Sequence, residues 1–380
     1  MKTDLLIVGG GLAGGLLAHA LSVRRPDLRV RLIERTASIG GNHIWSFFGA
    51  DVPADQRWIV DPFIDHRWPG YDVRFPAHAR SFDEPYHSLR SDRFDQRLRE
   101  LLPPETFIEG NAVSVATMRV QLDDQSVIEA GGVIDARGAS GGDTLDVGWQ
   151  KFLGQELRTS APHGLTQPIV MDADVAQHDG FRFVYTLPLA PDRLFVEDTY
   201  YSDTRSVDVP ALRTRIAAYA QLQGWRVAEV VGEEQGALPV TIGGDFEAYW
   251  AAGGEAGKIG MRAARFHGAT GYSLPQAVAS AAAIAAMPDL SGETLARALH
   301  DQAHQAWGAG GYYRLLNKMA FRAADPEQRF RIYERFYRLS SRLIARFYAG
   351  RSTPYDKLRI LAGKPPVPIG RALNVLLERR

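Results

Sequence analysis

The apolar positions near the start of the chain change their spacing twice within about thirty residues. Residues 4–8 (DLLIV) form an almost continuous aliphatic run, which is typical of a buried parallel strand. Residues 12–25 carry apolar side chains at helical spacing and end before Pro26. Residues 29–33 (RVRLI) predict a second strand. The N-terminal segment is therefore expected to form a strand–helix–strand unit.

Strand-like patterns dominate the middle of the chain. Residues 107–134 contain four short β-like runs separated by turn residues, as in an antiparallel meander. Longer strand-like stretches follow between residues 152 and 201, including 181–185 and 193–201. Helical spacing returns in residues 208–223, with Pro210 where the first turn of a helix tolerates it. Residues 273–287 form an alanine-rich helical pattern, and everything beyond residue 291 is expected to be helical.

A glycine motif joins the first strand to the first helix. Gly9, Gly11 and Gly14 match G-x-G-x-x-G, and Glu34 ends the second strand twenty positions after Gly14. The glycines allow a tight turn and close approach to a pyrophosphate at the helix N-terminus, and the acid can accept hydrogen bonds from a ribose. Glu34 favours FAD or NAD over a 2′-phosphorylated dinucleotide, because it would repel that phosphate. The motif alone does not distinguish FAD from NAD.

Three further glycine-rich segments favour a flavin. Residues 40–47 (GGNHIWSF) follow the second strand and suit a loop that runs close under a bulky cofactor. Residues 132–138 (GVIDARG) predict a strand that ends in an Asp and a glycine turn, as in flavoproteins of the para-hydroxybenzoate hydroxylase and geranylgeranyl reductase type. Residues 258–262 and 268–273 resemble the turn that meets the flavin ring in that superfamily. Each segment alone could be an ordinary turn.

These patterns predict an α/β protein with a Rossmann-type FAD-binding domain, an inserted α+β substrate domain and a helical C-terminal region. The expected cofactor domain is discontinuous, comprising residues 1–144 and 246–290. The substrate domain is expected to span residues 145–245, with a mixed or antiparallel sheet, and the helical region residues 291–380.

Residues 195–201 (FVEDTYY) contain the candidate catalytic acid. Strand alternation puts Glu197 on one face with Phe195, Thr199 and Tyr201, and Asp198 on the other face. If the first face lines an apolar pocket, desolvation raises the pKa of Glu197 and makes it a proton donor near neutral pH. The alternative is an exposed carboxylate on a surface strand.

The composition restricts the chemistry. The 380 residues include no cysteine, which excludes disulfides, thiolate metal sites, iron–sulfur clusters and a catalytic thiol. The 44 basic and 44 acidic residues cancel, which argues against bulk attraction to nucleic acid. The balance is uneven along the chain, because residues 312–380 hold 16 basic and 5 acidic side chains, whereas the rest holds 28 and 39. We expect no metal site, since the histidines show no spacing suited to one, and no serine elbow is present.

Several longer segments are more specific than the glycine motif. They are GGGLAGG at 9–15, GGNHIWSF at 40–47, RWPGYDVRFP at 67–76, PHGLTQPIVMDA at 162–173, RFVYTLPL at 182–189, FVEDTYY at 195–201, EEQGALPVT at 233–241, ATGYSLPQAV at 269–278, RFYAG at 346–350 and LAGKPPVP at 361–368. With these segments the chain resembles the bacterial lycopene beta-cyclases along essentially its full length. One departure is the sequence HGATGYS at 267–273, where the family pattern has proline after the histidine, and this puts the rigidity of the turn in doubt.

The resemblance implies a reaction and a set of site residues. The family cyclises lycopene through gamma-carotene to beta-carotene without net redox change, using reduced FAD, with NAD(P)H as the flavin reductant. It implies Glu197 as the catalytic acid, with Asp198 in a supporting role. The candidate cofactor-binding residues are Gly9, Gly11, Gly14, Glu34, Arg35, Gly41, Asn42, His43, Asp135, Gly138, Gly271 and Tyr272.

Two other classes of function remain open at this stage. One is a redox enzyme on the same scaffold, a flavin hydroxylase or prenyl reductase, which would consume NAD(P)H in proportion to its product. The other is a non-catalytic prenyl-binding escort of the GDI-like type, which would bind no flavin.

The C-terminal pattern suggests a membrane surface. After Asp325 and Pro326 we expect one helix that ends at Gly350, with arginines at 331, 335, 338, 342 and 346 opposite an aromatic face. Such a helix either packs its aromatic face on the core or lies against anionic lipid. With no segment long enough to span a bilayer, we expect a cytoplasmic, peripherally membrane-associated protein.

Overall fold

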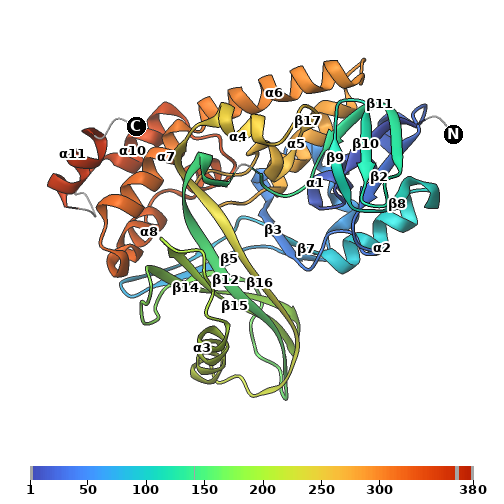
Figure 1. The fold of residues 1–380 in the computed structure, drawn as a ribbon. Helices are drawn as coiled ribbons and strands as arrows, with labels where there is room; N and C mark the ends of the chain where they lie inside the picture. Colours follow the sequence, from blue (N-terminus) through green and yellow to red (C-terminus); the bar gives the residue numbers. More distant parts are fainter. Residues whose placement is uncertain (1–2, 141, 364–367, 378–380) are drawn as a thin grey trace.

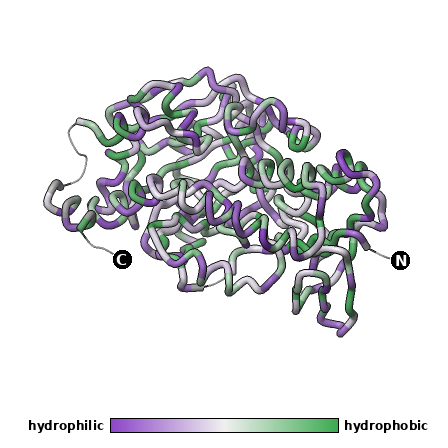
Figure 2. The backbone as a smooth tube through the Cα atoms, turned by 90° about the horizontal axis from the view of Figure 1, so that it is seen from above, coloured by the Kyte–Doolittle hydropathy of each residue, from purple (hydrophilic) through white to green (hydrophobic). Residues whose placement is uncertain are grey.

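The computed structural model describes residues 3–140, 142–363 and 368–377, and the chain ends lie at opposite sides of the molecule (Figure 1, Figure 2). Residues 364–367 of the LAGKPPVP segment therefore lie outside the described residues. The described strands form two seven-stranded sheets and one three-stranded sheet.

The first sheet is built on the N-terminal strand–helix–strand unit. Its strand order is β8 (Phe107–Glu109), β2 (Val30–Glu34), β1 (Thr3–Val8), β11 (Val127–Asp135), β10 (Arg119–Leu122) and β9 (Ala112–Val115), with β17 (Gly257–Lys258) beside β11. β1 pairs in parallel with both β2 and β11, and β2 with β8, so their carboxyl ends share one edge. The expected strand–helix–strand order is confirmed, with α1 (Leu12–Arg24) between β1 and β2.

The meander expected over residues 107–134 is only partly correct. β9, β10 and the first half of β11 pair antiparallel, whereas β8 joins the other side of the sheet beside β2. The second half of β11 turns inward and pairs in parallel with β1. This strand brings residues 132–135 back beside the glycine turn.

Helices cover one face of the first sheet, and strands β9 and β10 pack over the other face. α1 packs against α5 (Leu274–Ala285), while α6 (Gly292–Ala309) lies along β11 and β17. α2 (Ser91–Leu101) contributes Phe94 and Leu98 to the same core as β1 and α1. α1 carries apolar and small residues on all its sides, as is typical of a buried helix, and only its last turn reaches solvent.

The second seven-stranded sheet lies below the first in Figure 1. Its order is β16 (Val227–Gly244), β12 (Leu145–Thr159), β15 (Arg193–Ser202), β14 (Phe181–Ala190), β13 (Ile169–Asp172), β5 (Tyr71–Phe75) and β6 (His78–Phe82). We call it the large sheet because its strands β12, β14, β15 and β16 are the longest. Its strands pair antiparallel except for β5 and β13, which pair in parallel. α3 (Val209–Leu222) covers one face of this sheet, with its N-terminus capped by Asp208. α4 (Phe246–Ala252) follows β16 and leads back to the first sheet.

The expected domain boundaries need one correction. Residues 1–144 were assigned to the cofactor domain, but β5 and β6 extend the large sheet through the parallel pairing of β5 with β13. A small sheet of β3 (Ile44–Phe48), β7 (Tyr86–Arg90) and β4 (His66–Trp68) connects these strands to the N-terminal unit. The chain therefore crosses between the two large sheets more often than a single insertion predicts.

The C-terminal helix is two helices rather than one. α8 (Phe330–Tyr337) and α9 (Ser341–Tyr348) are separated at Leu339 and Ser340, and Asp325 starts a short 3-10 turn without a side-chain cap. α7 (Gly311–Lys318), α10 (Pro354–Leu361) and α11 (Ile369–Leu377) complete this region. Leu339 lies at this break and is buried in the same core cluster as the aromatic residues of the large sheet.

The aromatic residues of α8 and α9 pack on the large sheet. Tyr333 stacks on Phe181 with ring centroids 4.3 Å apart, and the Tyr337 and Tyr348 hydroxyls lie 2.5 Å apart. Buried Arg329 bonds to the carbonyl oxygens of Tyr201 and Ala320. The aromatic face of this segment is therefore part of the core, the first of the two alternatives drawn from its sequence.

Candidate active site

The glycine turn between β1 and α1 forms one end of the site. Gly9 has a φ of +107°, which favours glycine, and a methyl group at Gly14 would lie 2.0 Å from the Gly9 carbonyl oxygen. The turn and the helix can therefore pack this closely only with glycine at both positions. Beside Gly11, by contrast, the space that a side chain would take is open, so a ligand can approach the N-terminus of α1.

The acid at the end of β2 lies beside this turn. Glu34 accepts hydrogen bonds from the backbone N–H groups of Gly10, at 2.7 Å, and Arg35, at 2.9 Å. Glu34 and Arg35 both line the cavity described next. The parallel pairing of β1 with β2 brings the acid to the glycine turn, as the spacing of the motif predicts.

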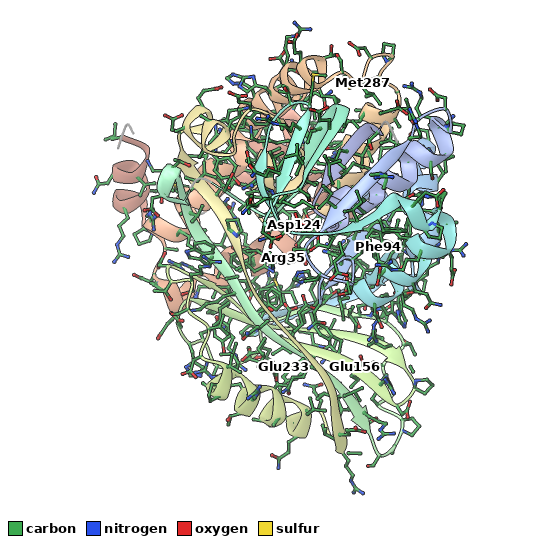
Figure 3. All side chains as sticks on the ribbon, turned by 45° about the vertical axis from the view of Figure 1, so that its right-hand side comes forward. Arg35, Phe94, Asp124, Glu156, Glu233 and Met287 are labelled. Carbon is green, nitrogen blue, oxygen red and sulfur yellow. The ribbon has the colours of Figure 1, made fainter. Side chains whose placement is uncertain are left out.

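A cavity of about 800 Å³ extends from the glycine turn to the large sheet. Its first end is lined by Gly9, Gly11 and Glu34, and its far end by side chains of β12, β14, β15 and β16. Figure 3 shows Arg35 between the first sheet and the strands that carry Glu156 and Glu233. Cavities of this size typically hold a cofactor or a small ligand.

The far end of the cavity is formed by residues that lie opposite one another on four neighbouring strands of the large sheet. Tyr185 in β14 pairs with Glu197 in β15, Glu197 with Gly154 in β12, and Gly154 with Glu234 in β16. Residues directly opposite one another in antiparallel strands project from the same face. Tyr185, Glu197 and Glu234 therefore face the cavity together, and Gly154 leaves the space between the two acids to the ring of Phe195.

Glu197 is largely withdrawn from solvent and, among the described residues, accepts one side-chain hydrogen bond. The Thr199 hydroxyl donates to its Oε1 at 2.5 Å. Burial raises the pKa of Glu197 to about 8, with further increases from nearby Glu234 and Asp198, while the Thr199 hydrogen bond opposes the rise. The carboxyl is therefore protonated at neutral pH and can act as an acid.

Asp198 lies on the opposite face of the sheet and does not line the cavity. Its carboxylate accepts hydrogen bonds from Arg182 Nε at 2.7 Å and the Tyr200 hydroxyl at 2.8 Å, and Arg215 donates to that hydroxyl. Successive strand residues alternate between faces, so Asp198 cannot contact a ligand in the cavity, and its predicted supporting role would act through strand β15. Through Arg182 and Tyr200, Asp198 holds β15 in place on the face of the sheet away from the cavity.

Glu234 is a second cavity carboxylate that the sequence analysis did not single out. Its Oε2 accepts the Ile44 N–H at 3.1 Å, and its Oε1 lies 3.0 Å from His43 Nδ1. The Glu234 side chain is 8% exposed and His43 is 49% exposed, so the pair connects the cavity wall with solvent. The alternation within β16 and its antiparallel register with β12 were the signals that could have identified it.

Most predicted cofactor-binding residues line the cavity, and three do not. Those lining it are Gly9, Gly11, Glu34, Arg35, Gly41, His43, Gly138, Gly271 and Tyr272. Gly14 supports the turn from behind, and the Asn42 side chain bonds instead to the Glu233 carbonyl oxygen at 2.9 Å. Buried Asp135 binds Arg137 at 2.8 Å and Arg262 at 2.9 Å, so the structure assigns it to holding two arginines.

The turn at residues 267–273 is well held without the family's proline. The His267 N–H donates to the Tyr272 carbonyl at 2.8 Å, and the Gly271 N–H donates to the His267 carbonyl at 2.8 Å. Gly271 has a φ of +71°, and Tyr272 faces the same cavity as Glu197. Backbone hydrogen bonds therefore supply the rigidity that Gly268 was expected to reduce.

The residues present fit a dinucleotide such as FAD. A glycine cradle, an open helix N-terminus and a carboxylate at the end of the second strand match what a pyrophosphate and a ribose require. The cavity continues beyond them toward Tyr272 and the large sheet, which leaves room for a ring system.

Comparison with known proteins identifies the family. The family model described as lycopene cyclase protein matches residues 4–374. This chain belongs to the lycopene cyclase family. It is 45% identical over 376 residues to a lycopene beta-cyclase of Pseudescherichia vulneris, covering 99% of this chain and 97% of the relative. It is also 41% identical over 383 residues to a lycopene beta-cyclase of Paracoccus sp., covering 100% and 98%.

Solved structures with a similar fold include a monooxygenase and a flavin-dependent halogenase. The p-nitrophenol 4-monooxygenase of Pseudomonas putida has a TM-score of 0.62 at 15% identity, covering 93% of this chain and all of that one. A flavin-dependent halogenase of Xanthomonas campestris has a TM-score of 0.58 at 13% identity, covering 99% and 95%. At this identity the likeness establishes the shared fold, an α/β architecture with a Rossmann-type cofactor domain.

Among the described residues, no helix combines the length and apolar character that crossing a bilayer requires.

Proposed function

We propose that this chain is a lycopene beta-cyclase that converts lycopene through gamma-carotene to beta-carotene by acid catalysis. The observation that carries the proposal is Glu197, a carboxyl group held protonated in the wall of a cavity that continues from the dinucleotide end. Membership of the lycopene cyclase family, and 41–45% identity to relatives named lycopene beta-cyclase, support the choice of substrate.

Glu197 supplies the proton that starts the reaction. Lycopene is a hydrocarbon without heteroatoms, so apolar walls such as Phe152, Phe183 and Leu238 must position it. The Glu197 carboxyl donates a proton to the terminal alkene, and a tertiary cation forms. The neighbouring alkene then closes a six-membered ring, and a ring proton leaves. One proton enters and one departs, so the enzyme acts as an isomerase with no net redox change.

Glu234 is placed to receive the departing proton. Glu197 and Glu234 are both paired with Gly154, so two strand spacings, roughly 10 Å, separate their Cα atoms. The ring of Phe195 occupies the space over Gly154 between them. His43, which contacts Glu234 and reaches solvent, can pass the proton outward.

Bound FAD completes the proposed site. Gly9, Gly11 and the N-terminus of α1 would hold its pyrophosphate, Glu34 its ribose, and Gly41, Gly138, Gly271 and Tyr272 the part nearer the large sheet. In its reduced form FAD supplies negative charge that stabilises a developing cation. NAD(P)H serves only to reduce the flavin and is not consumed with each ring closed.

We place the proposed membrane-facing surface on α10 rather than on α8 and α9. Tyr355, Leu358 and Leu361 are exposed on α10, next to exposed Arg359. Three of the five expected stripe arginines bind within the protein instead: Arg335 to the Ala362 carbonyl, Arg338 to Glu334, and Arg346 to Asp356. Leu358→Ser is expected to weaken co-sedimentation with anionic liposomes, and Leu222→Ser, an exposed leucine on α3, is the matched control. Equal weakening by both variants would contradict this assignment.

A flavin-dependent hydroxylase remains the second candidate, because the similar solved structures include monooxygenases. Anaerobic incubation of the purified protein with lycopene and either oxidised or chemically reduced FAD separates the two. We expect gamma-carotene and beta-carotene with reduced FAD only, and no consumption of NAD(P)H beyond the initial reduction. Oxygenated or saturated products formed in proportion to NAD(P)H, under air, would favour the hydroxylase or a prenyl reductase. Pigment unchanged under both conditions would favour an escort protein.

A further inference from the structure

Two helices that lie away from the cavity bring three metal-ligating side chains together. Glu247 stands in the first turn of α4, and His300 and His304 stand four residues apart on α6. Residues four apart on a helix project from the same side. The expectation that no histidines have a spacing suited to a metal is therefore wrong for this pair.

The three side chains converge on one point. Glu247 Oε2 lies 3.0 Å from His300 Nε2, and Glu247 Oε1 lies 2.8 Å from His304 Nδ1. One ligand atom from each residue falls within 4.8 Å of the others. All three side chains are partly exposed, so an ion can reach them from solvent and a water can complete its coordination.

Neighbouring groups hold the two imidazole rings. Trp250 packs against His300 with ring centroids 5.2 Å apart, and Phe246 packs edge-on against His304 at 5.6 Å. On its other side, His300 Nδ1 lies 3.4 Å from the Asp301 carboxylate, which would accept the Nδ1 proton when an ion occupies Nε2. A carboxylate behind a ligating histidine is a recurrent feature of metal sites, because it fixes the tautomer and the ring orientation.

We propose that Glu247, His300 and His304 bind a divalent transition-metal ion of the zinc class. Two imidazole nitrogens and one carboxylate suit Zn²⁺, Cu²⁺ or Ni²⁺, whereas Mg²⁺ and Ca²⁺ prefer all-oxygen sites. The ion would join α6 to α4, the helix through which the chain passes from β16 of the large sheet to β17 of the first sheet. Nothing in the proposed cyclisation requires this ion, so the site stands apart from the catalytic cavity.

Calorimetric titration of tag-free, chelator-treated protein with ZnCl₂ at pH 7.5 tests the proposal. We expect one ion per chain, and a loss of affinity of about tenfold or more in His300→Gln and in His304→Gln. His178→Gln, which removes an exposed histidine between β13 and β14, should leave the affinity unchanged. Circular dichroism in EDTA verifies that each variant is folded.

A second readout uses the tryptophan beside the site. CuSO₄ should quench the fluorescence of the wild-type protein, because Trp250 packs on His300, and the quenching should weaken in His300→Gln. No binding by the wild-type protein, or equal binding by all variants, would overturn the proposal.

Discussion

On one face of the large sheet Glu197 points into the cavity, and on the other face the next residue, Asp198, points toward α3. Both carboxyl groups are buried, yet their partners differ. Among the described residues the Thr199 hydroxyl donates to Glu197, whereas Arg182 and Tyr200 donate to the two oxygens of Asp198. An ion-paired carboxylate stabilises the fold, and a carboxyl without a cation partner retains its proton. Burial raises the pKa of both acids, so the different partners, together with the face of the sheet, distinguish the acid that can donate a proton into the cavity.

The largest expected effect comes from removing the acid on the cavity face. Glu197→Gln should reduce the rate of cyclisation by about 10² to 10⁴, because general acid catalysis contributes factors of that size. FAD binding should persist, since Glu197 lies far along the cavity from the glycine turn. Product formation per bound flavin measures the effect, with Gln150→Asn, another change on the cavity face, as the control. Normal cyclisation by Glu197→Gln with FAD bound would refute the assignment.

Removing the acid on the opposite face should instead affect stability. Asp198→Ala leaves Arg182 buried without its partner, at an expected cost of about 3 to 5 kcal/mol in the free energy of unfolding. Urea unfolding measures this loss, and Asp174→Ala, an exposed position after β13, is the control. A change below about 1 kcal/mol would mean that the Arg182 pair does not anchor β15.

Removing the two acids should change the free energy of unfolding in opposite directions: Asp198→Ala should lower it, and Glu197→Gln should raise it at high pH. Burial raises the pKa of Glu197 from its ordinary value to about 8, so the folded state binds an extra proton between those values. This contribution is fully present below the unfolded pKa and is lost as the pH rises through about 8. Above pH 8, Glu197→Gln should therefore stabilise the protein by ~5 kcal/mol relative to wild type. Stability curves that remain parallel from pH 5 to pH 9 would contradict the raised pKa.

Smaller changes around Glu197 should move its pH profile in opposite directions. Thr199→Val removes a hydrogen bond that lowers the pKa of Glu197, so the decline in activity should move to higher pH. Glu234→Gln removes the proposed proton acceptor and should lower the rate; it also removes a charge that raises the pKa of Glu197, so the decline of the remaining activity should move to lower pH. Each displacement should be about one pH unit or less. Movement of both profiles in the same direction would contradict the electrostatic account.

Part of this arrangement follows from local sequence patterns. The glycine turn, Glu34 and the opposite placement of Glu197 and Asp198 depend on spacing within single elements, and these predictions are confirmed by the geometry. The pattern of strand β15 could not show which of its faces meets a cavity, because the covering elements, α3 and the glycine-rich loops, come from distant parts of the chain.

Features that depend on pairing between distant segments were missed. Glu234 reaches the cavity only through the register of β16 with β12, in which Gly154 separates it from Glu197. His300 and His304 acquire their shared partner only when α4 packs beside α6. Asp135 matched a cofactor-binding pattern, but two arginines take up its carboxylate. Local periodicity contains none of these long-range contacts.

Infrared difference spectroscopy of wild type against Glu197→Gln, recorded as a function of pH, tests the central claim most directly. The difference spectrum isolates the single carboxyl group that faces the cavity. We expect the band of a protonated carboxyl to be present at pH 7 and to disappear with a midpoint of about 8. A carboxylate already formed at pH 6 would contradict the assignment of Glu197 as the acid.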